Sequence, residues 1–161
     1  MHVQAFAWIA RFATDEPLAV VDIGGRDING SPRRLFPNAR YTTVDLYDGP
    51  GVDQVGDCRD WAPPEPVDLV IVAEVLEHAP DPAGVVAAAV GYLASGGRLV
   101  LTCAGPGRAA HSGHDGGAVR DGEHYANIDP AALLGWLAGL DELAVTYEPG
   151  PCDVYATGIR R

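Results

Sequence analysis

The sequence contains no lysine, so all 11 of its basic residues are arginine. This absence excludes P-loop nucleotide binding, which requires a lysine in its motif, and Schiff-base catalysis by a lysine amine. The 22 acidic residues outnumber the basic ones and give a formal net charge of −11. Proteins that follow the phosphates of DNA or RNA normally show the opposite balance. We therefore expect no nucleic-acid partner.

Cysteine pairs, leader segments and long apolar runs are also missing. The three cysteines are scattered and form no C-x-x-C motif, which is typical of a reducing compartment. Residues 1–14 lack the basic start and the apolar run of a signal peptide, and no apolar stretch approaches the length of a membrane span. The sequence therefore predicts a cytoplasmic protein without a membrane partner.

The chain has enough apolar material for one domain. It has 161 residues, of which 47% are hydrophobic, and a chain of this length can bury a core without disulfides or a structural metal. We expect a single domain over residues 1–161.

Strand patterns alternate with helix patterns along the chain. A helix is predicted over 2–12, and capping residues followed by proline predict helices that begin near Ser31, Asp81 and Asp129. The second of these helices is expected to run to about residue 94 and to end at Gly96 and Gly97. Strands are predicted over 18–23, 41–46, 67–73 and 98–103, followed by an antiparallel pair over 143–147 and 153–159. This order indicates an open α/β sheet, whose ligands bind at the carboxyl ends of the strands.

The clearest motif is a glycine turn after the first strand. Asp22 ends that strand and is followed by Gly24 and Gly25, so a ligand can approach the main chain closely. About twenty residues later, Asp45 ends the second strand, where a carboxylate can accept both hydroxyls of a ribose. Taken singly, each aspartate could instead be an ordinary strand-end residue. Together they predict a nucleoside-containing cofactor.

Four segments carry a family resemblance. They read VVDIGGRDING, YTTVDL, VDLVIVAEVLEHAPDP and YLASGGRLVLT, and they span most of the region from residue 18 to residue 104. In these segments the chain resembles the Rossmann-like, class I S-adenosylmethionine-dependent methyltransferases, specifically their type 11 branch. The resemblance implies a three-layer α/β sandwich with a mostly parallel sheet and a C-terminal antiparallel hairpin. It also implies S-adenosylmethionine as cofactor and in-line methyl transfer to a small-molecule acceptor.

The resemblance also implies residue roles. Asp22, Gly24 and Gly25 would hold the methionine part of the donor, Asp45 the ribose and Asp57 the adenine amino group. The implied donor-binding set comprises Asp22, Gly24, Gly25, Asp45, Leu46, Asp57, Cys58 and Glu74. His78, Glu77 and His124 are the candidate bases if the acceptor must lose a proton. Arg26 and Ile28 stand where the commoner turn of the family has glycines.

The string Glu74-x-x-Glu77-His78, with His124 further on, allows a second interpretation. In some relatives a similar spacing gathers carboxylates and histidines around a divalent metal that orients an acceptor hydroxyl. In many others the same string occurs without metal. We expect no metal ligands here, and a metal-assisted O-methyltransferase stays open as an alternative.

A Gly-rich segment over 105–126 separates the last parallel strand from the final helix and has no periodicity. Loops of this length are typically lids or disordered, so we expect it to order over the cleft when donor and acceptor bind, with His111 and His114 at its mobile end. The acceptor site would be built by this loop, by residues 26–34, or by a homodimer or partner protein.

Two other protein functions share features of this sequence. A donor-binding accessory subunit without its own turnover would carry the same cofactor motifs. A dinucleotide dehydrogenase would also have a glycine turn, but it needs a G-x-G-x-x-G pattern that residues 25–30 do not provide.

Overall fold

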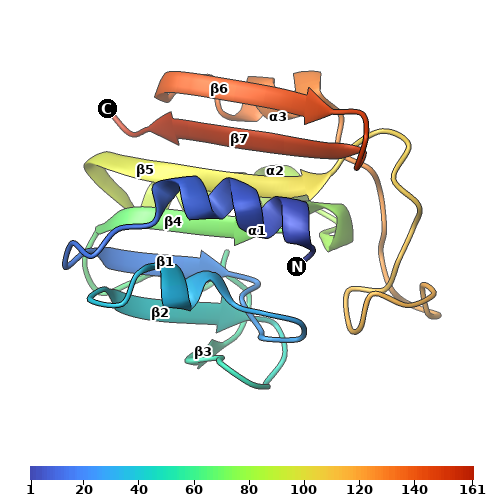
Figure 1. Cartoon of the computed structure of the whole chain (residues 1–161), viewed down its shortest axis with the longest axis horizontal. Coiled ribbons are helices and arrows are strands. Elements are labelled where there is room, and N and C mark those ends of the chain that lie inside the picture. Colours follow the sequence, from blue (N-terminus) through green and yellow to red (C-terminus); the bar gives the residue numbers. More distant parts are fainter.

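A seven-stranded sheet forms the centre of the molecule, in a computed structural model that describes all 161 residues (Figure 1). Its strand order is β3-β2-β1-β4-β5-β7-β6. The strands are β1 (Ala19–Ile23), β2 (Arg40–Asp45), β3 (Gln54–Val55), β4 (Val67–Ala73), β5 (Leu93–Ala104), β6 (Asp141–Glu148) and β7 (Asp153–Ile159).

The first five strands of the sheet run parallel, and β7 alone runs in the opposite direction, so it pairs in antiparallel fashion with both of its neighbours. β1 pairs with β2 and β4, and β4 pairs with β5, all in parallel register. β7 lies antiparallel between β5 and β6. From β1 the chain continues to β2 and β3 on one side and then returns to form β4 on the other side of β1. The carboxyl ends of β1 and β4 therefore flank the switch point at which open α/β sheets bind ligands. The predicted mostly parallel sheet with a C-terminal hairpin is confirmed.

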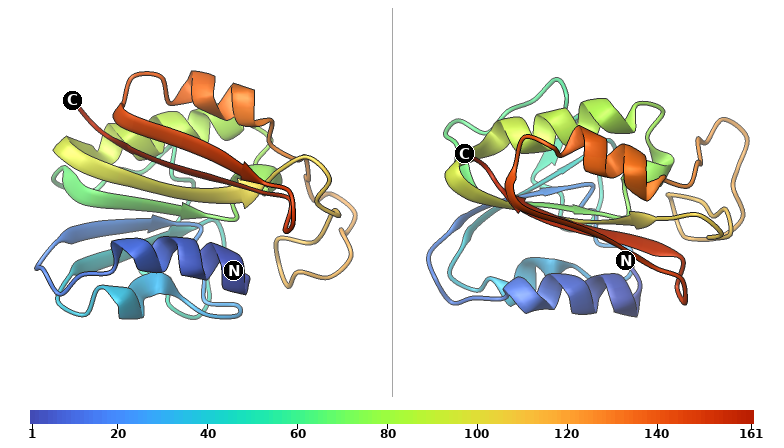
Figure 2. Two further views of the ribbon diagram at one scale, coloured as in Figure 1. Left: turned by 45° about the horizontal axis from the view of Figure 1, so that its top comes forward. Right: turned by 90° about the horizontal axis from the view of Figure 1, so that it is seen from above.

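Helices cover both faces of the sheet and make three layers (Figure 2). One face carries α1 with two short 3₁₀ turns, and the other carries α2 and α3. Their bounds are α1 (Val3–Ile9), η1 (Ala10–Phe12), η2 (Pro32–Leu35), η3 (Leu76–His78), α2 (Pro82–Tyr92) and α3 (Pro130–Trp136).

The two faces bury cores of different size. The larger core has 22 buried residues and includes Val86 and Ala89 of α2 and Leu133 of α3. The smaller one has 6 buried residues, among them Ile9 and Phe36, which pack against the opposite side of the strands. The face under α1 is therefore the thinner layer.

The predicted capping residues begin helices where expected. The side chains of Ser31, Asp81 and Asp129 each accept a hydrogen bond from a backbone N–H two or three residues further on. The first of the three begins only the 3₁₀ turn η2, four residues long.

The prediction that α2 reaches residue 94 and ends at Gly96 and Gly97 is wrong. Leu93 is already extended and opens β5. The Arg160 guanidinium donates to the carbonyls of Gly91 and Leu93, and the Gly96 N–H donates to the carbonyl of Arg160. These bonds from the C-terminal segment satisfy the last carbonyls of the helix and hold the chain in an extended conformation.

No helix of the structure is long and apolar enough to cross a membrane.

Candidate functional site

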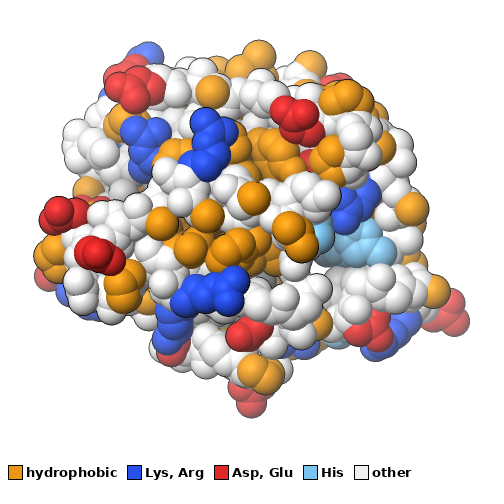
Figure 3. Space-filling model, in the orientation of Figure 1, with side chains coloured by type: hydrophobic (Ala, Val, Ile, Leu, Met, Phe, Trp, Pro, Cys, Tyr) orange, Lys and Arg blue, Asp and Glu red, His pale blue; other side chains and the backbone are white.

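A cleft of about 770 Å³ runs along the carboxyl ends of β1, β2 and β4. All eight residues of the predicted donor-binding set line it, although they come from four separate stretches of the chain. Further walls come from the first two residues of the chain and from the segments over 26–32, 75–85 and 105–126. In Figure 3 histidine and basic side chains gather near this end of the sheet, on the face that carries α1.

The turn after β1 tolerates only glycine. Gly24 has φ +71°, and a Cβ placed on it would lie 2.2 Å from Val75 Cγ2. A Cβ on Gly25 would lie 2.4 Å from Asp22 Oδ2. The Gly24 N–H donates to the carbonyl of Val44 at 2.7 Å, which fixes the turn against β2. The backbone is therefore bare where a ligand would approach the end of β1.

Asp22 is 1% exposed and has one carboxylate oxygen free of protein partners. Its Oδ2 accepts a hydrogen bond from the Tyr41 hydroxyl at 2.8 Å, whereas Oδ1 accepts none. Burial raises the pKa of Asp22 to about 7, against the opposing effect of the Tyr41 hydrogen bond. A buried acceptor without a partner beside a bare glycine turn fits a cationic or N–H group of a ligand.

Asp45 is held in a fixed orientation at the end of β2. Its Oδ1 accepts from the Tyr47 N–H at 2.9 Å and its Oδ2 from the Arg26 N–H at 3.2 Å. Each oxygen retains a lone pair. The carboxylate is half-buried and lines the cleft, so it can accept two hydroxyl groups of a ligand at once.

The next wall of the cleft combines apolar and charged side chains. Leu46 is 59% exposed and Cys58 is buried. Asp57 receives hydrogen bonds from the Arg59 guanidinium, with Nη2 2.6 Å from Oδ2, and these bonds hold the pKa of Asp57 below its usual value. An apolar surface beside an ionised carboxylate suits a flat heterocycle with an amino group.

Glu74 follows β4 in a strained conformation, with φ +58°. Its Oε1 accepts from the Thr102 hydroxyl at 3.0 Å, and its Oε2 lies 3.1 Å from His2 Nε2. Left-handed conformations of non-glycine residues are costly and cluster at functional sites. The conformation places the carboxylate in the cleft.

The three candidate bases lie in different environments. His78 and His124 line the cleft. Burial, and then the neighbouring His111, lower the pKa of His78, so its ring is neutral near pH 7 and able to accept a proton. Glu77 lies beneath the cleft, fully buried, and neither of its carboxylate oxygens has a partner. Burial, and then the charge of Glu74, raise its pKa to about 8.

Two groups of side chains could hold a metal ion. The first comprises Glu77, His78 and His111, whose ligand atoms lie within 4.8 Å of one another. The second comprises His2, Glu74 and Asp153. The ligand set suggested by the sequence, Glu74 with Glu77, His78 and His124, is thus divided between two groups, and His124 belongs to neither.

The segment over 105–126 contains neither helix nor further strand beyond the end of β5, and it extends past the carboxyl ends of the strands (Figure 1). It contacts the donor side of the cleft, where the His114 ring lies 4.7 Å from the Tyr47 ring. Its far end is fixed by a hydrogen bond of 2.8 Å from the Ala126 N–H to the carbonyl of Glu77. His111 packs edge-on against the His78 ring at 5.0 Å.

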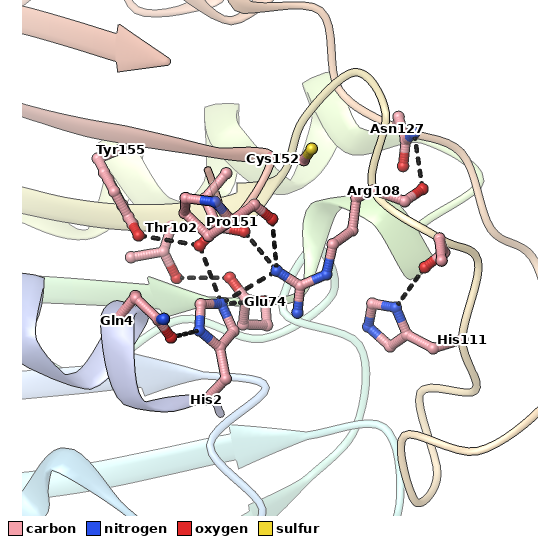
Figure 4. A network of polar contacts seen from close by, with 12 residues as sticks. His2, Gln4, Glu74, Thr102, Arg108, His111, Asn127, Pro151, Cys152 and Tyr155 are labelled. Atoms are coloured by element: carbon pink, nitrogen blue, oxygen red, sulfur yellow. Dashed lines mark hydrogen bonds and ion pairs between the residues drawn. The ribbon is translucent and has the colours of Figure 1, made fainter. Parts of the chain in front are cut away.

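Sequence reasoning missed the polar network at the other end of the cleft (Figure 4). His2 lies between Glu74 and Asp153, and the Arg108 guanidinium bonds to Asp153. His2 precedes α1 and Asp153 opens β7, so no local spacing links them to Glu74. The pairing of β7 with β5 brings Asp153 to this end of the sheet, and the packing of the first residues of the chain adds His2.

The fold and the cleft define a Rossmann-like, class I methyltransferase. Residues 1–141 match the family described as "Methyltransferase domain", and the chain belongs to this family. The predicted membership of the S-adenosylmethionine-dependent class is confirmed.

Solved structures share the fold. The N-methyltransferase NodS from Bradyrhizobium japonicum, in complex with S-adenosylhomocysteine, has a TM-score of 0.65 at 17% identity, over 98% of this chain and 86% of that one. The complex of DhpI with S-adenosylhomocysteine has a TM-score of 0.65 at 24% identity, over 96% of this chain and 82% of that one. A 1,6-didemethyltoxoflavin-N1-methyltransferase from Burkholderia thailandensis has a TM-score of 0.66 at 15% identity, over 97% of this chain and 78% of that one. Comparison with curated proteins finds no significant match.

Proposed function

We propose that this protein binds S-adenosylmethionine in the cleft and transfers its methyl group to a small-molecule acceptor. One observation carries the proposal: the eight residues of the donor-binding set converge on one cleft, at the turn where Gly24 and Gly25 leave the backbone bare. Several solved structures of this fold hold S-adenosylhomocysteine or S-adenosylmethionine.

The residues of the cleft fit the parts of this donor. The unpartnered Oδ1 of Asp22 suits the ammonium of the methionine part, and the Asp45 carboxylate suits the two ribose hydroxyls. Leu46 and Cys58 provide apolar contact for the adenine, and Asp57 an acceptor for its amino group. A bound sulfonium supplies a methyl group that is already activated for nucleophilic displacement.

The protein's own contribution is orientation and proton removal. The rigid turn and the fixed carboxylates hold the methyl donor in a set position relative to the acceptor. The reaction then takes place within one complex and does not depend on a bimolecular encounter in the right orientation. His78, with its lowered pKa, is placed to accept a proton from an acceptor that must lose one. The buried Glu77 carboxyl, with its pKa of about 8, is neutral at pH 7 and acts through the packing of the site.

Calorimetry followed by an acceptor assay tests this function. S-adenosylmethionine and S-adenosylhomocysteine are expected to bind with one site per chain, and release of S-adenosylhomocysteine then reports turnover over a panel of small acceptors. Binding without turnover on any acceptor would favour the accessory-subunit alternative. Absence of binding would refute the donor assignment.

The segment over 105–126 is proposed as a lid. Besides the His114–Tyr47 contact, the Gly113 carbonyl accepts from the Arg26 guanidinium at 3.5 Å, so the segment reaches across to the donor side. Closing such a segment removes water from the transfer site. S-adenosylhomocysteine is expected to slow tryptic cleavage after the exposed Arg120. An unchanged cleavage rate at saturating ligand would show that the segment is ordinary surface.

A metal-assisted O-methyltransferase is the second candidate, because the possible ligand atoms of Glu77, His78 and His111 lie within 4.8 Å of one another. Turnover that is lost with EDTA and restored by Mg²⁺ or Mn²⁺ would establish it. Turnover that is indifferent to EDTA would support the metal-free reaction, which we favour.

A cytoplasmic location is also part of this proposal. It is supported by three cysteines that form no disulfide. A homodimer or a partner protein that completes the acceptor site is a further proposal, which analytical ultracentrifugation would test.

A further inference from the structure

Beyond the donor half of the cleft, two carboxylates from different strands face a single imidazole (Figure 4). His2 Nε2 lies 3.1 Å from Glu74 Oε2 and 3.0 Å from Asp153 Oδ2. Glu74 follows β4, and Asp153 opens β7. We call these two residues the Glu74–Asp153 pair.

The contacts of His2 favour its protonated form. Its other ring nitrogen, Nδ1, lies 3.0 Å from Gln4 Oε1, so both nitrogens face oxygen acceptors, and Arg108 Nη1 lies 3.4 Å from Nε2. The hydrogen bond to Glu74 raises the pKa of His2, against the effect of burial. An imidazolium, which donates from both nitrogens, satisfies the oxygens on both sides of the ring.

The charges of the cluster favour a cation at the position of His2. Arg108 Nη1 lies 2.6 Å from Asp153 Oδ1, and it also donates to the carbonyl of Pro151 at 3.1 Å. Burial raises the pKa of Asp153, and the Met1 ammonium is a further positive charge near Glu74. His2 is the basic side chain that contacts both carboxylates, and its loss would leave these buried groups with less compensating charge, which is costly.

The two carboxylates are held in place independently of His2. Asp153 is fully buried and also accepts from the Tyr155 hydroxyl at 2.9 Å, and Glu74 accepts from Thr102. His2 itself is the residue that precedes α1, and its side chain makes no capping bond to that helix. Its side chain is 23% exposed, on the side of the cleft. The anionic partners are thus rigid, and the cation between them is the replaceable member.

We propose that the Glu74–Asp153 pair is the binding site for the acceptor nitrogen, and that the acceptor is a small primary or secondary amine that displaces the His2 imidazolium. This inference rests on the proposed methyl transfer and specifies its substrate class. The amine N–H groups donate to Glu74 Oε2 and Asp153 Oδ2. Displacement of His2 uncovers the oxygen of Asp153 that it now contacts.

Two carboxylates select an amine over other acceptors. A hydroxyl has a single hydrogen to donate and would leave one of the two carboxylates without a partner, whereas the ammonium form of a primary or secondary amine has at least two N–H groups and can satisfy both. An anionic acceptor would meet like charges. The positive charge of Arg108 is paired with Asp153 through Nη1, so it compensates the pair rather than a further anion.

The transfer step balances with the groups present and the sulfonium donor. An ammonium that replaces the imidazolium gives one proton to the Glu74 carboxylate, which takes for an amine the role proposed above for His78, and becomes a neutral amine. Its lone pair forms the N–C bond to the methyl carbon while the C–S bond breaks, and the electron pair of that bond stays on sulfur. The positive charge moves to the methylated nitrogen, where the Asp153 carboxylate stabilises it, and the proton on Glu74 leaves to water after product release.

Two donor analogues test the proposal without knowledge of the acceptor. In both, a nitrogen replaces the sulfur of S-adenosylhomocysteine and carries an arm in place of the methyl group, either 2-aminoethyl or 2-hydroxyethyl. Calorimetry at pH 7 is expected to show that the amino-armed probe binds at least about tenfold more tightly than the hydroxy-armed one. S-adenosylhomocysteine itself, which has no arm, measures donor binding separately.

Three variants and one control show which residues cause the difference in affinity between the two probes. Glu74→Gln and Asp153→Asn are expected to reduce the ratio of the two probe affinities to about threefold or less. Because Glu74 also belongs to the donor-binding set, the S-adenosylhomocysteine affinity of each variant is measured as the reference for its own two probes. His2→Ala is expected to bind the amino-armed probe more tightly than the wild type does, because no imidazolium has to be displaced. Asp121→Asn, which removes a carboxylate that lines the cleft outside the pair, leaves the ratio unchanged.

The outcomes separate the two proposals. If S-adenosylhomocysteine does not bind the wild-type protein, the proposed function fails. If it binds but the two probes have equal affinity, or if the ratio survives in Glu74→Gln, the amine proposal is overturned while donor binding stands. Should Asp153→Asn fail to fold, Glu74→Gln and His2→Ala decide the question.

Discussion

Replacing Asp45 by alanine isolates the contact that the account assigns to the ribose. The carboxylate is oriented by the N–H groups of Arg26 and Tyr47, at 3.2 and 2.9 Å, and it lines the cleft. The variant removes both oxygens that face the cleft and leaves the glycine turn untouched.

The expected loss follows from the strength of charge-assisted hydrogen bonds. Loss of a bidentate contact to a carboxylate costs about 2 to 3 kcal/mol, which corresponds to about a hundredfold weaker binding. The fold loses less, about 1 kcal/mol, because the two freed N–H groups lie where water can reach them.

Titration calorimetry with S-adenosylhomocysteine measures the binding loss, and thermal unfolding verifies that the variant is folded. Asp48→Ala is the matched control, because Asp48 is an exposed carboxylate three residues away that does not line the cleft. It is expected to bind as the wild type does. A folded Asp45→Ala protein with wild-type affinity would refute the ribose assignment.

Three further predictions concern the turn, the buried acid and the surface charge. Gly24→Ala forces a Cβ to within 2.2 Å of Val75 Cγ2 and is expected to abolish S-adenosylhomocysteine binding in calorimetry, whereas Gly91→Ala, where the space is open, preserves it. Glu77 has a pKa of about 8 in the folded protein, above its ordinary 4.5, so its stabilising effect is complete below pH 4.5 and is lost as the pH rises to 8. Chemical denaturation is therefore expected to show a smaller loss of stability between pH 5 and pH 8 for Glu77→Gln than for the wild type; an equal loss would contradict the raised pKa. At the net charge of −11, low-micromolar protein is expected to shift neither DNA nor RNA in a gel at physiological salt, and a shift would overturn that expectation.

Much of the fold follows from local patterns in the sequence. Asp81 with Pro82 marks the start of α2 because the cap and the proline act within a few residues of each other. The apolar run over 67–73, broken only by Asp68, predicts β4 because a strand covered on both faces needs no polar side. The donor half of the site is equally local, since each of its residues ends a strand or lies in the turn that follows one.

The remaining features depend on contacts between distant segments. The early end of α2 depends on Arg160, which lies 69 residues beyond Gly91. The position of His2 between Glu74 and Asp153 depends on the packing of the first residues against the end of β7. No periodicity or motif in the sequence encodes such contacts, so the acceptor half of the cleft emerges only from the three-dimensional structure.

Hydrogen exchange with and without S-adenosylhomocysteine reports where the donor binds as well as whether it binds. Saturating ligand is expected to slow exchange in the turn over 22–27 and in the segment over 45–58, with little change in β6. Unchanged exchange in both segments at saturation, or slowing confined to another part of the chain, would contradict the assignment of the donor to this cleft.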